Sequence, residues 1–158
     1  MLVSFIVALA LQSNISAEPS DLDRAYLMAC APKSAQILAV SGCIGMVSSV
    51  CQETEDEGYT TYGMGVCSQR ELAIWDERLN AAYSTLIANY RSDASLVNRA
   101  TALQDAQRLW ISYRDAECAQ EALVFEGGTA AGIIYAGCLV HFTARRALDL
   151  EIQQLEPN

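Results

Sequence analysis

The stretch CAQEALVFEGGTAAGIIYAGC, residues 118–138, places two cysteines at nearly equal distances from a pair of glycines. Cys118 lies nine residues before Gly127, and Cys138 lies ten residues after Gly128. Glycine after the last turn of a helix adopts the left-handed conformation that ends it. Helices on both sides of this turn would form an antiparallel hairpin with the two cysteines at the same height. We therefore expect a Cys118–Cys138 disulfide.

Apolar residues recur at steps of three and four around this turn and earlier in the chain, which is the helical period. The pattern predicts helices over residues 64–90, 96–124 and 130–155. In the second helix we expect Trp110 and Tyr113 to face the core. The chain has 158 residues and only three prolines, which suits one hydrophobic core and long uninterrupted helices. We predict an all-α fold, a small antiparallel bundle of about four helices stapled by disulfides.

The remaining four of the six cysteines are paired by the same counting. Cys51 and Cys67 each lie eight residues from Tyr59, so a bridge between them would close a second, shorter hairpin. Cys30 then pairs with Cys43 by elimination. A bridge from Cys43 to Cys51 within one helix is disfavoured, because eight residues rise about 12 Å and bridged Cα atoms lie within about 7 Å.

The first seventeen residues have the pattern of a secretory signal peptide. An apolar run over residues 2–11 is followed by polar residues and by Ser16 and Ala17, a small-residue cleavage pattern. The run is too short to span a bilayer as a helix. An even number of cysteines beyond residue 17 fits an oxidising compartment. We therefore expect residues 1–17 to be removed and the protein to be periplasmic or secreted.

Composition and motifs argue against several functions. The formal net charge of -9 disfavours nucleic acid and stable association with anionic membranes. No CxxC occurs and His141 is the only histidine, so the sequence predicts no metal site and no cofactor. The carboxylates of Asp115 and Glu117 are two residues apart and point in different directions on a helix. With no catalytic motif present, we expect no catalytic residues and no enzyme.

The densest acidic cluster is a candidate contact for a partner protein. We place its four acids on the loop between the first helices: Glu53, Glu55, Asp56 and Glu57. Their charge would favour a basic partner, although a solvated acidic connection without a partner gives the same pattern. Arg114 and Asp115 are a second candidate. They are either ion-pair struts between helices, which we prefer, or the edge of a binding face.

Three segments together resemble the LprI lysozyme-inhibitor family: TTYGMGVCSQRELAIWDERLNAAYSTL (60–86), AQRLWISYRDAEC (106–118) and CLVHFTARRALDLE (138–151), with Gly127 and Gly128 between the last two. The matching pieces run from about Cys43 to Glu151. The resemblance implies a variable helical extension over residues 18–45 and an LprI-like helical domain over residues 46–156.

The resemblance also implies a function and a partner. It implies an exported protein that binds and inhibits lysozyme. Chicken-type lysozymes are basic proteins with a carboxylate-lined cleft, so an acidic inhibitor gains association rate from electrostatic steering. The alternative is a structural or adaptor protein of the cell envelope without inhibitory activity.

Overall fold

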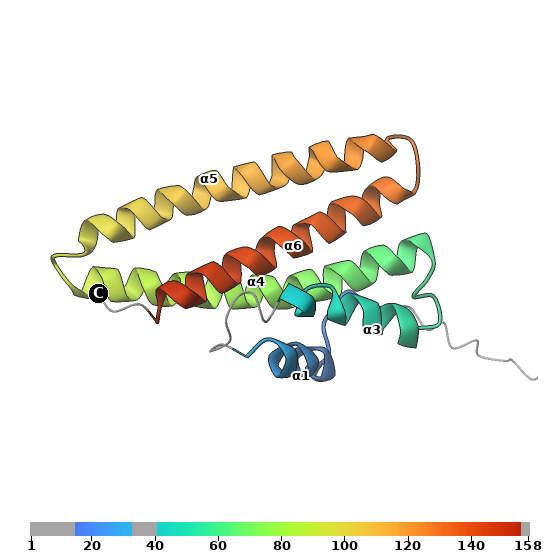
Figure 1. The fold of residues 1–158 in the computed structure, drawn as a ribbon, viewed down its shortest axis with the longest axis horizontal. Coiled ribbons are helices and arrows are strands. Elements are labelled where there is room, and N and C mark those ends of the chain that lie inside the picture. Colours follow the sequence, from blue (N-terminus) through green and yellow to red (C-terminus); the bar gives the residue numbers. More distant parts are fainter. Residues whose placement is uncertain (1–14, 33–40, 156–158) are drawn as a thin grey trace, which may run out of the picture.

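A computed structural model describes residues 15–32 and 41–155 of the chain (Figure 1). Most of the expected signal peptide, residues 1–14, lies outside these described residues. Within the described ranges the chain forms five α-helices and two 3₁₀ turns and no strand: α1 (Asp21–Cys30), η1 (Ser41–Cys43), α3 (Met46–Thr54), α4 (Thr61–Ser92), α5 (Val97–Ala122), η2 (Leu123–Phe125) and α6 (Ala130–Gln153).

The three long helices form an antiparallel bundle. α6 packs along α4, and α5 packs mainly against α6, while the short helices α1 and α3 lie on the other side of α4 (Figure 1). The predicted all-α fold is confirmed, with five α-helices in the described residues where about four were expected. α4 begins earlier than predicted because the Thr60 side chain accepts a hydrogen bond from the backbone N–H of Gly63, which caps the helix.

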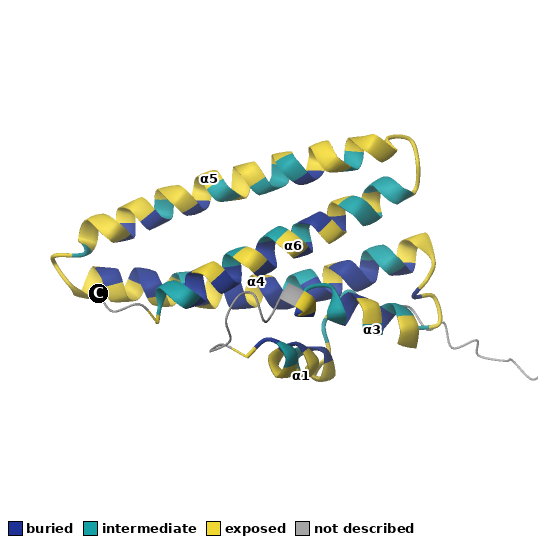
Figure 2. Ribbon diagram, viewed as in Figure 1, coloured by how far each residue is buried: buried dark blue, intermediate teal, exposed yellow. Residues whose placement is uncertain are grey.

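The core lies between the facing sides of α4 and α6 (Figure 2). Trp75 and Leu86 from α4 and Leu150 from α6 are among the largest fully buried side chains. Ala144 and Ala147 of α6 have no exposed surface, and their small side chains let the two helices approach closely. The apolar residues that recur with helical period in the sequence therefore form the contact between α4 and α6.

The prediction for Tyr113 is wrong. Its side chain is 55% exposed, and its ring meets the edge of Phe142 with 5.7 Å between centroids. The buried face of α5 is centred on Gln107 and Cys118, and at about 100° per residue Tyr113 lies well off that line. Trp110 is half-buried and packs against the core, so it faces the core only in part.

Glu71 on α4 is a fully buried carboxylate that caps a different helix. Its oxygens accept hydrogen bonds from the backbone N–H groups of Gly45 (2.7 Å) and Ser48 (2.8 Å) at the start of α3, and from Ser48 Oγ (2.9 Å). The indole N–H of Trp75 donates to the same carboxylate at 3.0 Å. The N-cap of α3 is Gly45, which has no side chain to cap with, so Glu71 supplies the acceptor and the negative charge that a helix N-terminus favours.

Arg78 continues this buried polar chain toward α1 and α6. Its guanidinium lies over the ring of Trp75 and donates to both carboxylate oxygens of Glu151 at 3.0 and 2.7 Å. It also donates to the carbonyl oxygen of Ala31, the C-cap of α1, at 2.8 Å. The two charged side chains are only 6% and 8% exposed. This ion pair therefore connects three helices from inside the fold.

The three expected disulfides are present. The Cα atoms of Cys30 and Cys43 are 5.7 Å apart, those of Cys51 and Cys67 are 5.6 Å apart, and those of Cys118 and Cys138 are 5.5 Å apart. The described residues contain no free cysteine. Counting outward from two turns gave two of the bridges, because an antiparallel hairpin brings residues at equal distances from its turn to the same height. Elimination gave the third, Cys30–Cys43.

We expect replacement of both Cys118 and Cys138 by alanine to lower the free energy of unfolding by about 3 kcal/mol. The bridge closes a loop with a sequence separation of 20, and cross-linking a loop of this size restricts the unfolded chain by about that amount. Urea denaturation of the oxidised proteins measures the difference. A loss below about 1 kcal/mol would show that the hairpin is held by packing alone.

Candidate protein-binding surface

The acidic cluster predicted from the sequence lies at one end of the bundle. We define the acidic loop as residues 53–60, which comprise the last two residues of α3 and the connection to α4, at the right in Figure 1. Glu53 lies in the last turn of α3 and not in the loop between helices as predicted. The side chains of Glu53, Asp56 and Glu57 are exposed, and Glu55 is half-buried.

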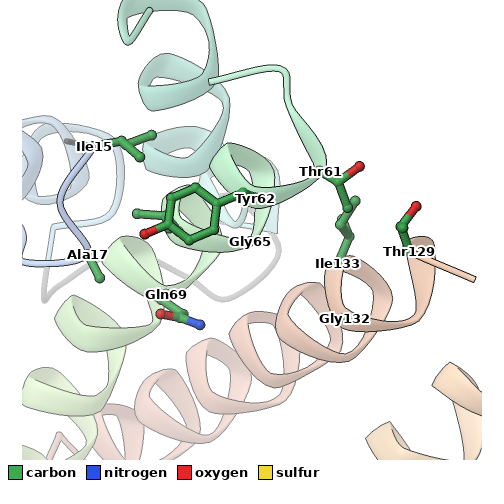
Figure 3. Close-up of a pocket in the computed structure, with 10 residues that line it drawn as sticks. Ile15, Ala17, Thr61, Tyr62, Gly65, Gln69, Thr129, Gly132 and Ile133 are labelled. Carbon is green, nitrogen blue, oxygen red and sulfur yellow. The ribbon is translucent and has the colours of Figure 1, made fainter. Parts of the chain in front are cut away.

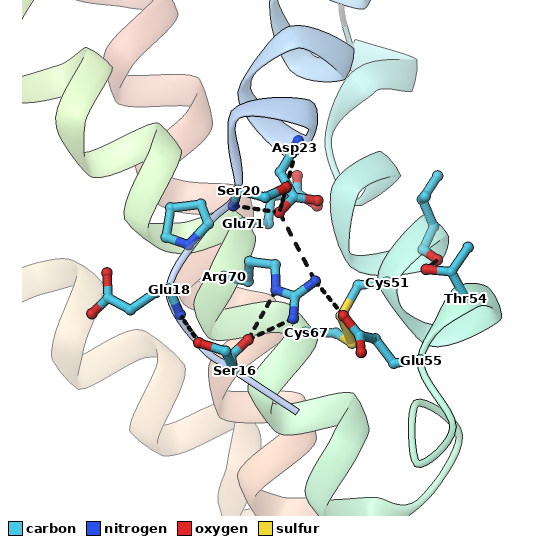
Figure 4. Close-up of polar contacts among 12 residues, drawn as sticks. Ser16, Glu18, Ser20, Asp23, Cys51, Thr54, Glu55, Cys67, Arg70 and Glu71 are labelled. Atoms are coloured by element: carbon cyan, nitrogen blue, oxygen red, sulfur yellow. Dashed lines mark hydrogen bonds and ion pairs between the residues drawn. A yellow bond between two sulfur atoms is a disulfide. The ribbon is translucent and has the colours of Figure 1, made fainter. Parts of the chain in front are cut away.

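Glu55 is part of an ion-pair cluster centred on Arg70 of α4 (Figure 4). The Arg70 guanidinium lies 2.8 Å from the Glu55 carboxylate and 3.9 Å from that of Asp23 on α1. It also donates two hydrogen bonds, at 2.9 and 2.7 Å, to the carbonyl oxygen of Ser16. Arg70 is buried, and Glu55 neutralises it. Through these contacts Arg70 holds the end of α3 and the segment before α1 against α4. The solvent-facing charge of the cluster therefore comes from the other three acids.

Two exposed tyrosines accompany the acids. Tyr59 in the acidic loop is 68% exposed and Tyr62 in the first turn of α4 is 66% exposed. Tyrosine is enriched in protein–protein interfaces, because it combines a large apolar ring with a hydrogen-bonding hydroxyl. Neither tyrosine was predicted as a contact residue from the sequence, although Tyr59 stands directly beside the acidic cluster.

A groove opens beside Tyr62, between the first turns of α4 and α6 and the segment before α1 (Figure 3). Its volume is about 590 Å³. Gly65 and Gly132 line it from opposite helices, and a Cβ atom at either glycine would meet nothing within 4 Å. Ile15 lines it from the segment before α1 and is itself 7% exposed. The groove is therefore open space between helices, and its walls come from three separate parts of the chain.

The same end of the bundle carries an exposed apolar turn (Figure 1). We define the apolar tip as η2, Leu123–Phe125, where the chain passes from α5 to α6. Leu123 and Val124 are 60% and 76% exposed. From the sequence, this region was predicted only to end a helix. The run Leu-Val-Phe directly before Glu126 and two glycines could have marked it, because turns are normally polar and an exposed run of three apolar residues there is unusual unless it is functional.

Arg114 and Asp115 lie on α5 and not in the acidic loop. They pair with each other, Arg114 Nη2 to Asp115 Oδ1 at 2.8 Å, so the preferred prediction of an ion pair between helices is wrong. The contact of Arg114 with the neighbouring helix is a hydrogen bond to an uncharged group: Arg114 donates to Oγ1 of Thr143 on α6 at 3.2 Å. Neighbouring residues of one helix reach each other without the partner helix, which explains the local pairing.

Two guanidinium groups lie near the ring of Trp110. The guanidinium carbon of Arg114 is 5.1 Å from its ring centroid and that of Arg146 is 5.9 Å from it. Arg146 also donates to Oε1 of Gln107 at 3.0 Å. Burial lowers the pKa of Arg146, because the charged form is partly removed from water. This cluster joins α5 to α6, while the side chains of Arg114 and Asp115 remain 17% and 47% exposed.

The described residues contain no group of three His, Cys, Asp or Glu side chains that could hold a metal ion. Over the same ranges, no helix combines the length and the hydropathy needed to cross a membrane. The fold and its surface define an all-α protein, stapled by three disulfides, with acidic, aromatic and apolar side chains exposed at one end of the bundle.

Residues 51–150 match the family described as lysozyme inhibitor LprI, and the chain belongs to this family. A similar protein from Rhizobium meliloti (strain 1021) is 28% identical over 96 residues, which cover 56% of this chain and 69% of that protein. It is described as uncharacterized. No solved structure shows significant similarity to the chain.

Proposed function

We propose that this protein is an exported inhibitor of lysozyme, which acts by binding the enzyme and carries out no catalysis of its own. The observation that carries the proposal is the family match over residues 51–150, which includes all of α4, α5 and the 51–67 and 118–138 disulfides. Three disulfides fit an oxidising compartment. We further propose that residues 1–17 are removed on export and that the chain then works in the periplasm or outside the cell.

The distribution of charge supports binding of the enzyme at the end of the bundle that carries the acidic loop. The net charge is -9, and the exposed acids Glu53, Asp56 and Glu57 lie together on or beside one loop. A basic lysozyme approaching an acidic partner is steered by the summed field before any contact forms. Tyr59 and Tyr62 then offer exposed aromatic surface for short-range contact.

We expect the variant Glu53→Gln, Asp56→Asn, Glu57→Gln to bind a basic lysozyme with an association rate about tenfold lower at low salt, because rim charges act mainly on association. The matched control is Asp21→Asn, Asp105→Asn, Asp149→Asn, which removes the same charge at exposed sites elsewhere and should change the rate by less than about threefold.

Surface plasmon resonance over a salt series measures both rates. The advantage of the wild-type protein over the acidic-loop variant should disappear as the salt concentration rises. Equal association rates for the variant and the control would show that the acidic loop is not part of the binding surface. Absence of any binding by the wild-type protein would contradict the proposed function itself.

A further inference from the structure

The apolar tip exposes three consecutive apolar side chains to solvent. Leu123, Val124 and Phe125 are 60%, 76% and 42% exposed, and η2 contains no buried residue. They stand at the turn between α5 and α6, at the end of the hairpin (Figure 1). Contiguous apolar surface of this kind marks sites of protein contact.

The tip is held rigidly by short-range contacts. The backbone N–H of Glu126 donates to the carbonyl of Leu123 at 3.0 Å, and that of Gly128 donates to the carbonyl of Phe125 at 2.9 Å. Gly127 has a φ of 77°, which L side chains rarely adopt. The Cys118–Cys138 bridge closes the hairpin behind the turn. A loop fixed in this way loses little conformational entropy when it binds.

The charge around the tip is of one sign. From residue 115 to residue 144 the chain contains no lysine or arginine. Glu121 and Glu126 are exposed on either side of the tip, and Glu117 is half-buried further down α5. An apolar projection with an acidic margin is complementary to a cleft that repels inserted negative charge and has a basic margin.

We propose that the apolar tip inserts into the substrate cleft of the lysozyme, with Glu121 and Glu126 at the rim of the cleft; this rests on the proposed function. Glycoside hydrolases of this kind hold two carboxyl groups in the cleft, and in lysozyme one of them lies in a hydrophobic pocket. An acidic side chain inserted there would be repelled. An uncharged apolar tip is not repelled, and the acids beside it remain near the basic outer surface.

The test compares Leu123→Ser, Val124→Ser, Phe125→Ser with the control Leu22→Ser, Val97→Ser, Leu109→Ser, which alters exposed apolar side chains elsewhere (62%, 46% and 72% exposed). We expect the tip variant to raise the inhibition constant at least about hundredfold and the control to change it less than about threefold. Inhibition by the wild-type protein should be competitive, so that the apparent KM of lysozyme for a soluble oligosaccharide rises and kcat does not change.

Circular dichroism and thiol titration check that both variants are folded and oxidised. If the tip variant still inhibits competitively, insertion of the apolar tip into the cleft is wrong, and the proposed function is unaffected. Inhibition that lowers kcat without raising KM would also overturn insertion into the cleft. A tip variant that changes only self-association, measured by analytical ultracentrifugation, would assign the tip to a second copy of this chain. Absence of inhibition by the wild-type protein would overturn both proposals.

Discussion

Replacing Glu71 with alanine should lower the free energy of unfolding by about 4 kcal/mol. The change removes the acceptor for the backbone N–H groups of Gly45 and Ser48 and for the indole N–H of Trp75. A buried donor left without a partner costs about 1–3 kcal/mol. The loss is limited where water reaches Gly45, whose contact with the carboxylate is only partly buried.

The variant Glu71→Gln separates geometry from charge. Each carboxylate oxygen of Glu71 accepts from at least one N–H group, and an amide has only one oxygen, so one N–H must face the NH₂ group. We expect this variant to fall between alanine and the wild-type protein. Glu53→Gln, an exposed acid of α3, is the control and should change stability by less than about 0.5 kcal/mol. Urea denaturation measures all three, and a loss below about 1 kcal/mol for Glu71→Ala would contradict the capping role.

Replacing Arg78 with alanine should cost a similar amount, about 4 kcal/mol. Removing one partner of a buried ion pair leaves an uncompensated buried charge, which typically costs 3–5 kcal/mol, and here the remaining charge is Glu151 at 8% exposure. The substitution also frees the carbonyl of Ala31 and removes the contact with the Trp75 ring.

The double variant Arg78→Met, Glu151→Leu distinguishes a buried-charge penalty from lost packing. Because apolar replacement of both partners is often nearly neutral, it should recover at least half of the stability that Arg78→Ala loses. Arg108→Ala, which breaks the exposed pair with Asp105, should cost less than about 1 kcal/mol. The same urea denaturation measures the double variant. If it is as unstable as Arg78→Ala, the loss comes from packing that the pair provides and not from an uncompensated buried charge.

The parts of the fold that follow from local periodicity and counting could be predicted. Helix period and turn position place Cys118 opposite Cys138, because both depend only on residues close in sequence. The role of Glu71 could not be predicted in this way. A glutamate within a helix is normally exposed, and this one is buried because its acceptors serve the start of α3, more than twenty residues away.

The candidate surface was predicted in part. The density of acids identifies residues 53–57, but the sequence does not show that Arg70 neutralises Glu55 from another helix. It does not show that the acidic loop and the apolar tip lie at the same end, because that depends on how α4 and α6 pack (Figure 1). Tyr113 was misplaced because α5 carries apolar residues on two sides, and only packing shows which side faces the core.

The most direct test of the proposed inhibition is an activity assay of a basic lysozyme titrated with the purified, fully oxidised protein. We expect dose-dependent, competitive inhibition that weakens as salt screens the charge of the acidic loop. Full lysozyme activity at every concentration of the protein, with the three disulfides intact, would contradict it.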